Sequence, residues 1–431
     1  MDAQTDFLPA RPLTRQDAKT LVLSALGGAL EFYDFIIFVF FTAVIGRLFF
    51  PADMPDWLKQ FQAFGIFAAG YLARPLGGVI MAHFGDKAGR KRMFTLGVFL
   101  MAVPTLLIGF LPTYAVLGYG APILLLLMRV MQGAAIGGEV PGAWVFVSEH
   151  VPARRVGLGC SLLTGGLTSG ILIGSLTASA VTVNLTSDQV MSYGWRIPFI
   201  LGGLFGLVVV YLRRWLSETP VFEEIRRLEQ ISKTLPLKTV LAGHKGAVAL
   251  SMVSTWMLTA AIVVVILMTP TLLGRLYGVP MAQALTANSL ATACLSISCV
   301  LVGLAVDRFG PLKVLAVGSP SLLVSVYLLY LGTAAAPVWL PLFYAIAGAA
   351  VGIIAVVPIL MVHAFPAAIR FSGISFSYNV AYAVFGGITP LAVPLATAAI
   401  PLFPAHYVAL ACVLAPALVL LFIGAKARHA L

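Results

Sequence analysis

The sequence predicts an all-α membrane protein with twelve transmembrane helices in two pseudo-symmetric six-helix bundles. Of its 431 residues, 60% are hydrophobic and only 10% are charged, whereas soluble domains have about 45–50% apolar and about 25% charged residues. The apolar runs are about 20 to 30 residues long, which suits spanning helices rather than the roughly ten-residue strands of a barrel. A charged turn in the first half also returns, in weaker form, in the second half.

Twelve apolar spans follow one another along the chain. They cover residues 20–48, 58–83, 93–111, 119–148, 155–184, 194–213, 245–275, 281–306, 313–332, 336–363, 370–398 and 402–424. The long polar stretch 214–244 carries Glu223, Glu224, Arg226 and Arg227, so we expect a linker with an amphipathic helix there. The predicted parts are an N-terminal bundle at 1–213, a cytoplasmic linker at 214–244 and a C-terminal bundle at 245–431.

A short charged turn after the second span marks the repeat. It reads Gly85-Asp86-Lys87-Ala88-Gly89-Arg90-Lys91, and its glycines allow a tight reversal with close backbone approach. A weaker copy follows the eighth span, with Asp307 and Arg308 at matching places. The segment 152–157 before the fifth span likewise corresponds to 366–373 before the eleventh. Parallel repeats of this kind indicate two related halves.

Lysine and arginine concentrate in alternate loops. Of the 27 such residues, 21 lie near the chain ends or in loops on one side of the predicted membrane. The opposite loops hold only Arg47, Lys59, Arg196 and Arg275, and the remaining two, Arg74 and Arg129, lie inside spans. Since positively charged loops stay in the cytoplasm, both termini are predicted to be cytoplasmic.

The composition argues against several other functions. The net charge of +11 follows the loops and does not indicate a nucleic-acid partner. The four cysteines lie in apolar runs without motif spacing, so we expect no disulfide framework and no metal site. The sequence contains no nucleotide-binding motif and no nucleophile–base constellation, so we expect no cofactor and no enzymatic activity. The expected partners are a small-molecule substrate, protons and the lipid bilayer, and the expected state is a monomer.

Charged side chains inside the spans concentrate in the first half. They are Glu31, Asp34, Arg74, Arg129 and Glu139, and the nearest equivalents in the second half are His363 and Asn379. Such groups are costly in a membrane and by default mark a pathway for substrate or protons. The alternative is a set of ion pairs that only ties helices together. Glu31 and Asp34 share a helix face because they are three residues apart.

These residues supply candidates for binding and coupling. The guanidinium fork of an arginine suits a carboxylate, and polar groups in the middle of a span suit a cavity wall. The substrate-binding candidates are Arg74, Arg129, Gln132, Tyr33, Tyr378, Asn379 and Tyr382. The proton-coupling candidates are Asp34, Glu31 and Glu139, because a carboxyl group removed from water can titrate near neutral pH. We favour Asp34, which lies nearest the middle of the first span, with Glu139 as the alternative.

The charged turns predict two gates. Asp86 should lie beside the start of the eleventh span, near 370–373, where the helix dipole favours an anion. Arg90 should reach Glu149, and Asp307 should face the start of the fifth span near 154–157. The full set of gating candidates is Gly85, Asp86, Gly89, Arg90, Glu149, Asp307 and Arg308.

The motifs together resemble the metabolite:proton symporter family of the major facilitator superfamily. They are Glu31–Phe35, Ala73–Gly78, the turn at 85–92, Arg129–Gly133, Gly137–Glu139, Trp195–Phe199, Ser217–Pro220, Asn379 and Phe385–Gly387. The chain departs from the family pattern at Ala82, at Val140-Pro141 and at Pro311. The resemblance implies the major facilitator fold, and uptake of a small organic solute with protons across a bacterial cytoplasmic (inner) membrane by alternating access.

The substrate class stays open between several readings. We expect a proton-coupled symporter for a small organic acid, such as a di- or tricarboxylate. The alternative is a symporter for a zwitterionic osmolyte such as proline or betaine, or for a shikimate-type solute. In the osmolyte reading an aromatic cage would hold the ammonium group. An exporter of the same fold and a membrane sensor that has lost transport are further possibilities.

Overall fold

The computed structural model describes residues 12–227 and 236–429. Within these residues twelve helices are long and apolar enough to cross a membrane, and no strand occurs among them. Their positions follow the twelve predicted spans to within a few residues at most ends. The predicted fold class is therefore confirmed.

The first half of the chain and the linker region form the following helices. They are α1 (Arg15–Phe40), α2 (Thr42–Phe49), α3 (Asp56–Ala88), α4 (Arg90–Phe110), α5 (Tyr114–Leu117), α6 (Gly120–His150), η1 (Ala153–Arg155), α7 (Val156–Asn184), α8 (Ser187–Gln189), η2 (Val190–Gly194), α9 (Arg196–Arg213), α10 (Pro220–Arg227) and α11 (Pro236–Gly243).

The second half forms a similar series. Its helices are α12 (Lys245–Ala260), η3 (Ala261–Met268), α13 (Thr269–Tyr277), α14 (Met281–Phe309), α15 (Pro311–Ala335), η4 (Pro337–Trp339), α16 (Leu340–Val351), η5 (Gly352–Ala355), α17 (Val356–Ala364), η6 (Ala367–Ile369), α18 (Arg370–Ala399) and α19 (Phe403–His429).

The first predicted span differs most from the structure. Its helix begins at Arg15, five residues early, because Thr14 forms a capping box: its hydroxyl accepts from the Asp17 N–H and its own N–H donates to the Asp17 carboxylate. Hydropathy misses this polar first turn. The span then divides at Phe41, which separates α1 from α2. In the linker region, α10 is amphipathic, with Phe222 buried and Glu223 exposed.

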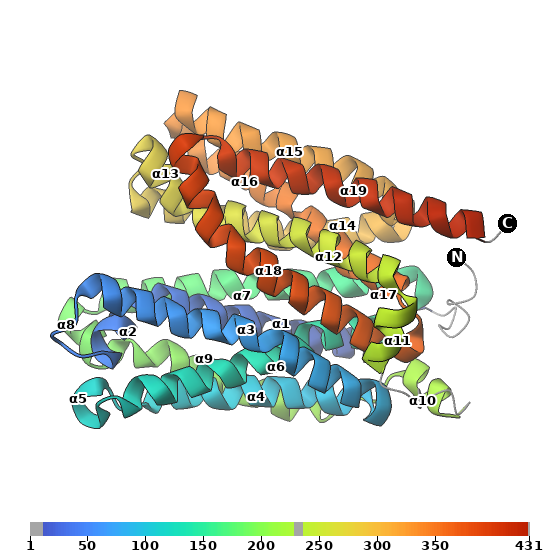
Figure 1. Cartoon of the computed structure of the whole chain (residues 1–431), viewed down its shortest axis with the longest axis horizontal. Helices are drawn as coiled ribbons and strands as arrows, with labels where there is room; N and C mark the ends of the chain where they lie inside the picture. Colours follow the sequence, from blue (N-terminus) through green and yellow to red (C-terminus); the bar gives the residue numbers. More distant parts are fainter. Residues whose placement is uncertain (1–11, 228–235, 430–431) are drawn as a thin grey trace.

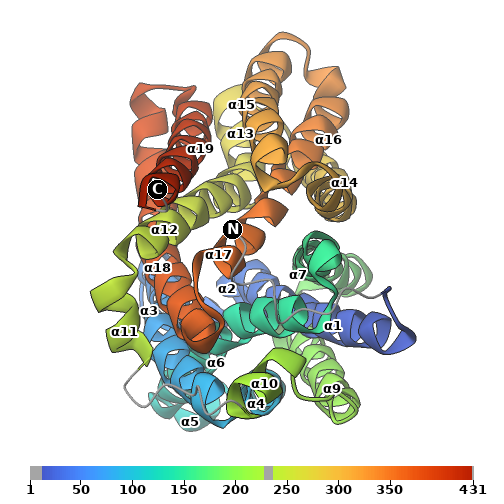
Figure 2. The ribbon, with the colours of Figure 1, turned by 90° about the vertical axis from the view of Figure 1, so that its right-hand side faces the viewer.

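The two halves lie side by side with their helices roughly parallel (Figure 1). Within the first half α3 packs on α6, α1 on α7 and α4 on α9, and within the second half α14 packs on α16 and α15 on α19. Between the halves α7 contacts α14, and α3 contacts α18. The α3–α4 turn lies at the same end as the linker helices α10 and α11 (Figures 1 and 2). We call this end of the molecule the α3–α4 end.

Glycines bring α3 and α6 into backbone contact. A Cβ atom added at Gly133 would collide with the backbone of Gly70, and one at Gly137 would collide with the backbone of Arg74. Small residues permit such close approach of membrane helices. The close packing places Arg74 of α3 and Arg129 of α6 in the same part of the molecule, where both line one small hollow.

Candidate functional site

Arg74 of α3 lies where the two halves of the chain meet. Its guanidinium carbon is 4.5 Å from the ring centroid of Tyr382, 5.5 Å from that of Tyr71 and 5.8 Å from that of Tyr378. Tyr71 belongs to α3, whereas Tyr378 and Tyr382 belong to α18. Three of the substrate-binding candidates from the sequence, Arg74, Tyr378 and Tyr382, therefore lie together. We call these four residues the Arg74–tyrosine cluster.

The ion pair of Arg74 is the loosest among the buried arginines that have one in the described spans. Its carboxylate partner is Glu31, with Nη2 and Oε1 3.8 Å apart. Arg129, Arg213 and Arg370 each have a carboxylate oxygen within 3.3 Å. The Nε and Nη2 atoms of Arg74 and the Oε2 atom of Glu31 are buried and have no hydrogen-bond partner in the described part of the chain. Since buried polar groups are usually paired, Arg74 and Glu31 retain binding capacity.

Asp34 and Arg129 belong to a tighter network. Arg129 Nη1 donates to Asp34 Oδ2 at 3.3 Å and to Gln132 Oε1 at 2.9 Å. Thr105 on α4 donates to Asp34 Oδ1 at 2.9 Å and accepts from Gln132 Nε2 at 2.8 Å. The guanidinium carbon of Arg129 is also 4.2 Å from the Phe38 ring centroid. Each carboxylate oxygen of Asp34 therefore has a partner.

A hollow of about 10 Å³ lies between the two arginines. It is lined by Phe67, Gly70, Tyr71, Arg74, Arg129, Gln132, Gly133 and Ile136. A space of this size holds about one water molecule. The space beside the two predicted binding arginines is thus too small for an organic solute in this conformation.

Tyr33 and Asn379 are not part of the Arg74–tyrosine cluster. The Tyr33 hydroxyl donates to the carbonyl of Pro198 at 3.0 Å, which joins α1 to α9. The Asn379 amide nitrogen donates to the carbonyl of Gly137 at 2.6 Å and to that of Ser375 at 2.7 Å. Both side chains tie helices together here, and their roles in substrate binding stay predictions.

Arg213 is a buried cation that sequence reasoning missed. Its Nη2 donates to Glu139 Oε1 at 2.8 Å and its Nη1 to Glu139 Oε2 at 3.3 Å, and both side chains are fully buried. The prediction that Arg74 and Arg129 are the only arginines inside spans is wrong. Arg213 is the last residue of the sixth span, so hydropathy assigned it to the loop. Glu139 was the signal that could have found it, because a carboxylate inside a span usually has a basic partner.

The predicted contact of Asp86 is present at the α3–α4 end. Asp86 Oδ2 accepts from the backbone N–H of Ser372 at 2.9 Å and from its hydroxyl at 2.7 Å. This places the carboxylate on the first turn of α18, where the helix dipole favours an anion. Gly85 permits the approach, since a Cβ there would collide with the ring of Phe371. Gly89, with φ of 114°, turns the chain into α4.

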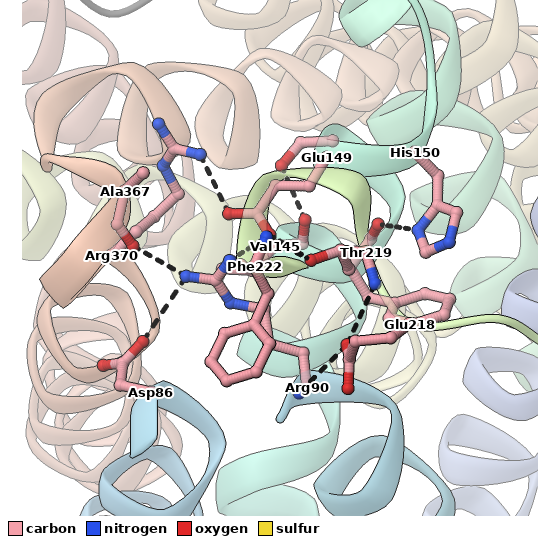
Figure 3. Close-up of polar contacts among 12 residues, drawn as sticks. Asp86, Arg90, Val145, Glu149, His150, Glu218, Thr219, Phe222, Ala367 and Arg370 are labelled. Atoms are coloured by element: carbon pink, nitrogen blue, oxygen red, sulfur yellow. Dashed lines mark hydrogen bonds and ion pairs between the residues drawn. The ribbon is translucent and has the colours of Figure 1, made fainter. Parts of the chain in front are cut away.

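A buried charge network joins the halves beside Asp86 (Figure 3). Arg90 Nη1 donates to Glu149 Oε2 as predicted, and its Nη2 donates to the carbonyl of Ala367 at 2.6 Å. Arg370 Nη1 donates to Glu149 Oε1 at 3.0 Å. We call Asp86, Arg90, Glu149 and Arg370 the gate network. Its charges come from α3, α4, α6 and α18.

The linker contacts this network, which the sequence did not suggest. The Glu218 carboxylate accepts from the backbone N–H groups of Arg90 and Lys91, each at 3.1 Å. The Thr219 hydroxyl donates to Glu149 Oε2 at 2.9 Å (Figure 3). Glu218 thus acts as the anion at the start of α4, as the helix dipole favours.

The second charged turn makes the pseudo-symmetric contact. Asp307 accepts from the backbone N–H of Gly157 at 2.7 Å and from that of Leu158 at 3.0 Å, so it lies at the start of α7 as predicted. Arg308 is exposed, with its guanidinium carbon 5.2 Å from the Phe309 ring. The contact of Asp307 joins α14 of one half to α7 of the other. The roles of these residues in gating stay predictions.

The sequence matches the family described as Major Facilitator Superfamily over residues 36–390. The chain belongs to the major facilitator superfamily. Its relatives include a putative proline/betaine transporter of Staphylococcus aureus, 36% identical over 90% of this chain and 84% of that protein. The shikimate transporter of Escherichia coli is 33% identical over 88% of this chain and 89% of that protein. The resemblance seen in the motifs is confirmed.

A solved structure of the same superfamily shares the fold. The proton:xylose symporter XylE of E. coli, bound to 6-bromo-6-deoxy-D-glucose, superimposes with a TM-score of 0.77 over 93% of this chain and 94% of that chain, at 16% identity. This major facilitator protein is therefore a multi-pass membrane protein of a transporter family, not an enzyme. Its Arg74–tyrosine cluster lies between the two halves, and its gate network lies at the α3–α4 end.

Proposed function

We propose that this protein imports a small solute with one carboxylate, coupled to protons, by alternating access. The first candidate is a zwitterion such as proline or betaine, and the second is a shikimate-type solute. The observation that carries the proposal is Arg74, which lies between the two halves with two buried guanidinium nitrogens that lack a hydrogen-bond partner among the described residues. A desolvated guanidinium binds a carboxylate strongly and in a defined orientation.

The number of available cations favours one carboxylate over two or three. Arg129 and Arg213 are engaged by Asp34 and Glu139 at 3.3 and 2.8 Å, whereas Arg74 is held only loosely. A di- or tricarboxylate would bring further anionic groups to a site where Arg74 is the one loosely held arginine among the paired arginines of the described spans, at a large desolvation cost. Proline, betaine and shikimate, which the names of the two relatives mention, each carry one carboxylate. These points favour the alternative kept open above over the di- or tricarboxylate.

The proposed orientation puts the α3–α4 end in the cytoplasm. Without the buried Arg213, 20 of the 27 lysines and arginines lie near the chain ends or in loops of this side, as the positive-inside rule requires. The relatives are bacterial, which supports the cytoplasmic membrane of a bacterium as the location. With this orientation the gate network closes the cytoplasmic side, and substrate would enter from outside.

For proton coupling we infer a competition at Arg74. A substrate carboxylate that binds Arg74 takes the cation away from Glu31, 3.8 Å distant. A buried carboxylate that loses its counter-charge then takes up a proton, because an unpaired charge in low dielectric is costly. Substrate and proton would travel together. Glu31 now fits this role better than Asp34, whose oxygens accept from Arg129 and Thr105.

Uptake into proteoliposomes tests the proposal. We expect labelled betaine, proline or shikimate to accumulate when the external pH is lower than the internal pH, and citrate not to compete. Arg74→Lys should raise the half-saturating concentration at least about tenfold, since a bidentate contact is lost. Arg214→Lys is the control, because Arg214 is exposed.

Three results would contradict the proposal. Unchanged affinity in both Arg74→Lys and Arg129→Lys would rule out a carboxylate site at these arginines. Substrate accumulation that does not depend on the pH gradient would rule out proton coupling. Binding without any transport would favour the sensor reading over transport.

A further inference from the structure

We propose that Tyr71, Tyr378 and Tyr382 bind an ammonium group of the substrate, and that the guanidinium of Arg74 occupies the position this ammonium takes. The inference rests on the proposed function, because it concerns the same site, and it goes further by assigning a cation subsite. The class of ligand it selects is a zwitterion whose cation is a secondary or quaternary ammonium. A solute with a carboxylate but no cation would use only Arg74.

The rings form an aromatic wall around one cation. The Tyr71 and Tyr382 rings are parallel to within 6°, with centroids 6.0 Å apart. The Tyr378 ring is 5.3 Å from that of Tyr382 and tilted by 51°. All three centroids lie within 5.8 Å of the guanidinium carbon. A cation within about 6 Å of a ring centroid is attracted by the ring quadrupole, so the geometry already selects positive charge.

The wall is buried, which strengthens this attraction. Tyr378 and Tyr382 are 1% and 3% exposed, and Arg74 is 5% exposed. Trp144 supports the wall from behind, with its ring 5.1 Å from that of Tyr378 at 87°. Quaternary ammonium groups are recognised elsewhere by cages of aromatic rings, and the attraction is stronger where the cation is removed from water. The three tyrosines have the ring type and spacing that such recognition needs; Tyr378 and Tyr382 are buried and Tyr71 is partly buried.

Arg74 and the substrate cation would compete for the same rings. When the ammonium binds the tyrosines, repulsion between like charges displaces the guanidinium, which can then pair with the carboxylate of the same solute. The ammonium thus replaces the guanidinium, so that only one cation contacts the three rings at any time. A zwitterion alone supplies both groups at once, whereas an acid without a cation uses only Arg74 and an amine without a carboxylate has to compete with Arg74 for the rings.

The rings also come from both halves of the chain. Tyr71 lies on α3 of the first half, and Tyr378 and Tyr382 lie on α18 of the second. A cation held among them therefore contacts both halves. This makes the closing of the two halves over the site depend on a bound cation.

Equilibrium binding of betaine, shikimate and choline to purified full-length variants tests the assignment. Tyr382→Leu should weaken betaine binding about tenfold, the equivalent of one buried cation–π contact, and change shikimate binding less than about threefold. Tyr382→Phe should bind both solutes nearly as the wild type does, since the ring remains. Phe385→Leu is the matched control, because Phe385 lies on the same helix and stacks on Trp256 instead.

The decisive variant is Arg74→Gln. It should lose betaine affinity and gain binding of choline, which carries the quaternary ammonium but no carboxylate and should not bind the wild type. If Tyr382→Leu does not fold, as judged by thermal unfolding, Tyr71→Leu from the other half replaces it.

The outcomes separate this inference from the proposed function. Equal loss of betaine and shikimate binding in Tyr382→Leu, or no gain of choline binding in Arg74→Gln, would overturn the cation subsite while leaving the carboxylate site intact. Binding of shikimate but not of betaine by the wild-type protein would likewise overturn the cation subsite and leave the carboxylate site intact. Unchanged affinity for both solutes in Arg74→Lys would instead contradict the proposed function.

Discussion

Arg370 on α18 donates to Glu149 on α6 across 3.0 Å, so a buried ion pair connects the two halves of the chain. The same carboxylate accepts from Arg90 on α4 and from the hydroxyl of Thr219 in the linker. Glu149 is fully buried. Because this one carboxylate on α6 binds groups from three other segments, removing its charge tests whether it holds the α3–α4 end closed.

Neutralising Glu149 should open the α3–α4 end. In Glu149→Gln two buried arginines lose their shared anion, and breaking a buried ion pair costs about 3–5 kcal/mol. We expect a second, longer population in the distance distribution between spin labels at exposed Ala88 and Lys313. Glu224→Gln is the control, because Glu224 pairs with Arg227 at an exposed site, where ion pairs contribute little. An unchanged distribution in Glu149→Gln would remove Glu149 from the gate.

Glu218 should couple the linker to the gate network. Its carboxylate accepts two backbone N–H groups at the start of α4, where a negative charge is worth about 0.3–1 kcal/mol. Glu218→Gln should therefore lower the initial rate of uptake a few-fold without changing substrate affinity. Glu223→Gln, an exposed position on α10, should behave as the wild type. A change in affinity instead of rate would show that the linker acts on the binding site.

The α3–α6 contact should tolerate no extra methyl group. In Gly133→Ala the new Cβ would meet the backbone of Gly70, which cannot move aside as a side chain can, and such overpacking costs about 1–3 kcal/mol. Thermal unfolding in detergent should show a clear drop in Tm. Gly65→Ala on α3 is the control, since nothing lies within 4 Å of its Cβ position. Equal Tm values for the two variants would mean that α3 and α6 are not in backbone contact.

Replacing the coupling carboxylate should separate exchange from accumulation. We expect Glu31→Gln to abolish uptake driven by a pH gradient while counterflow exchange of substrate continues, because the neutral side chain cannot release a proton. Asp34→Asn should mainly lower stability, since it leaves Arg129 buried without its anion. Accumulation that survives in Glu31→Gln and fails in Asp34→Asn would return the role to Asp34. If only Glu139→Gln abolishes accumulation, the coupling role belongs to Glu139.

The contacts made by residues of the two charged turns were predictable from the sequence. The contacts of Asp86 with Ser372 and of Asp307 with Gly157 follow from the two charged turns, because the repeat pairs each turn with the start of a particular span. The contact of Arg90 with Glu149, at the end of α6, was also predicted. The spans were also predictable, since twenty or so apolar residues are a requirement of the membrane itself. How deeply a charged side chain at the end of a span is buried could not be predicted from the sequence. Arg213 ends its span by composition, yet packing of α9 on α4 buries it against Glu139 and the Phe94 ring.

The sequence by itself determined the membrane class, the twelve helices, the two related halves and the set of intramembrane charges, because hydropathy and motif spacing are local properties. Only the tertiary structure decided which charges meet. It paired Asp34 with Arg129 and Glu139 with Arg213, left Arg74 loosely held by Glu31, and set three tyrosines from two helices around it. The physical reason is that a charge in low dielectric is governed by partners within about 4 Å, and those partners come from helices far apart in the sequence.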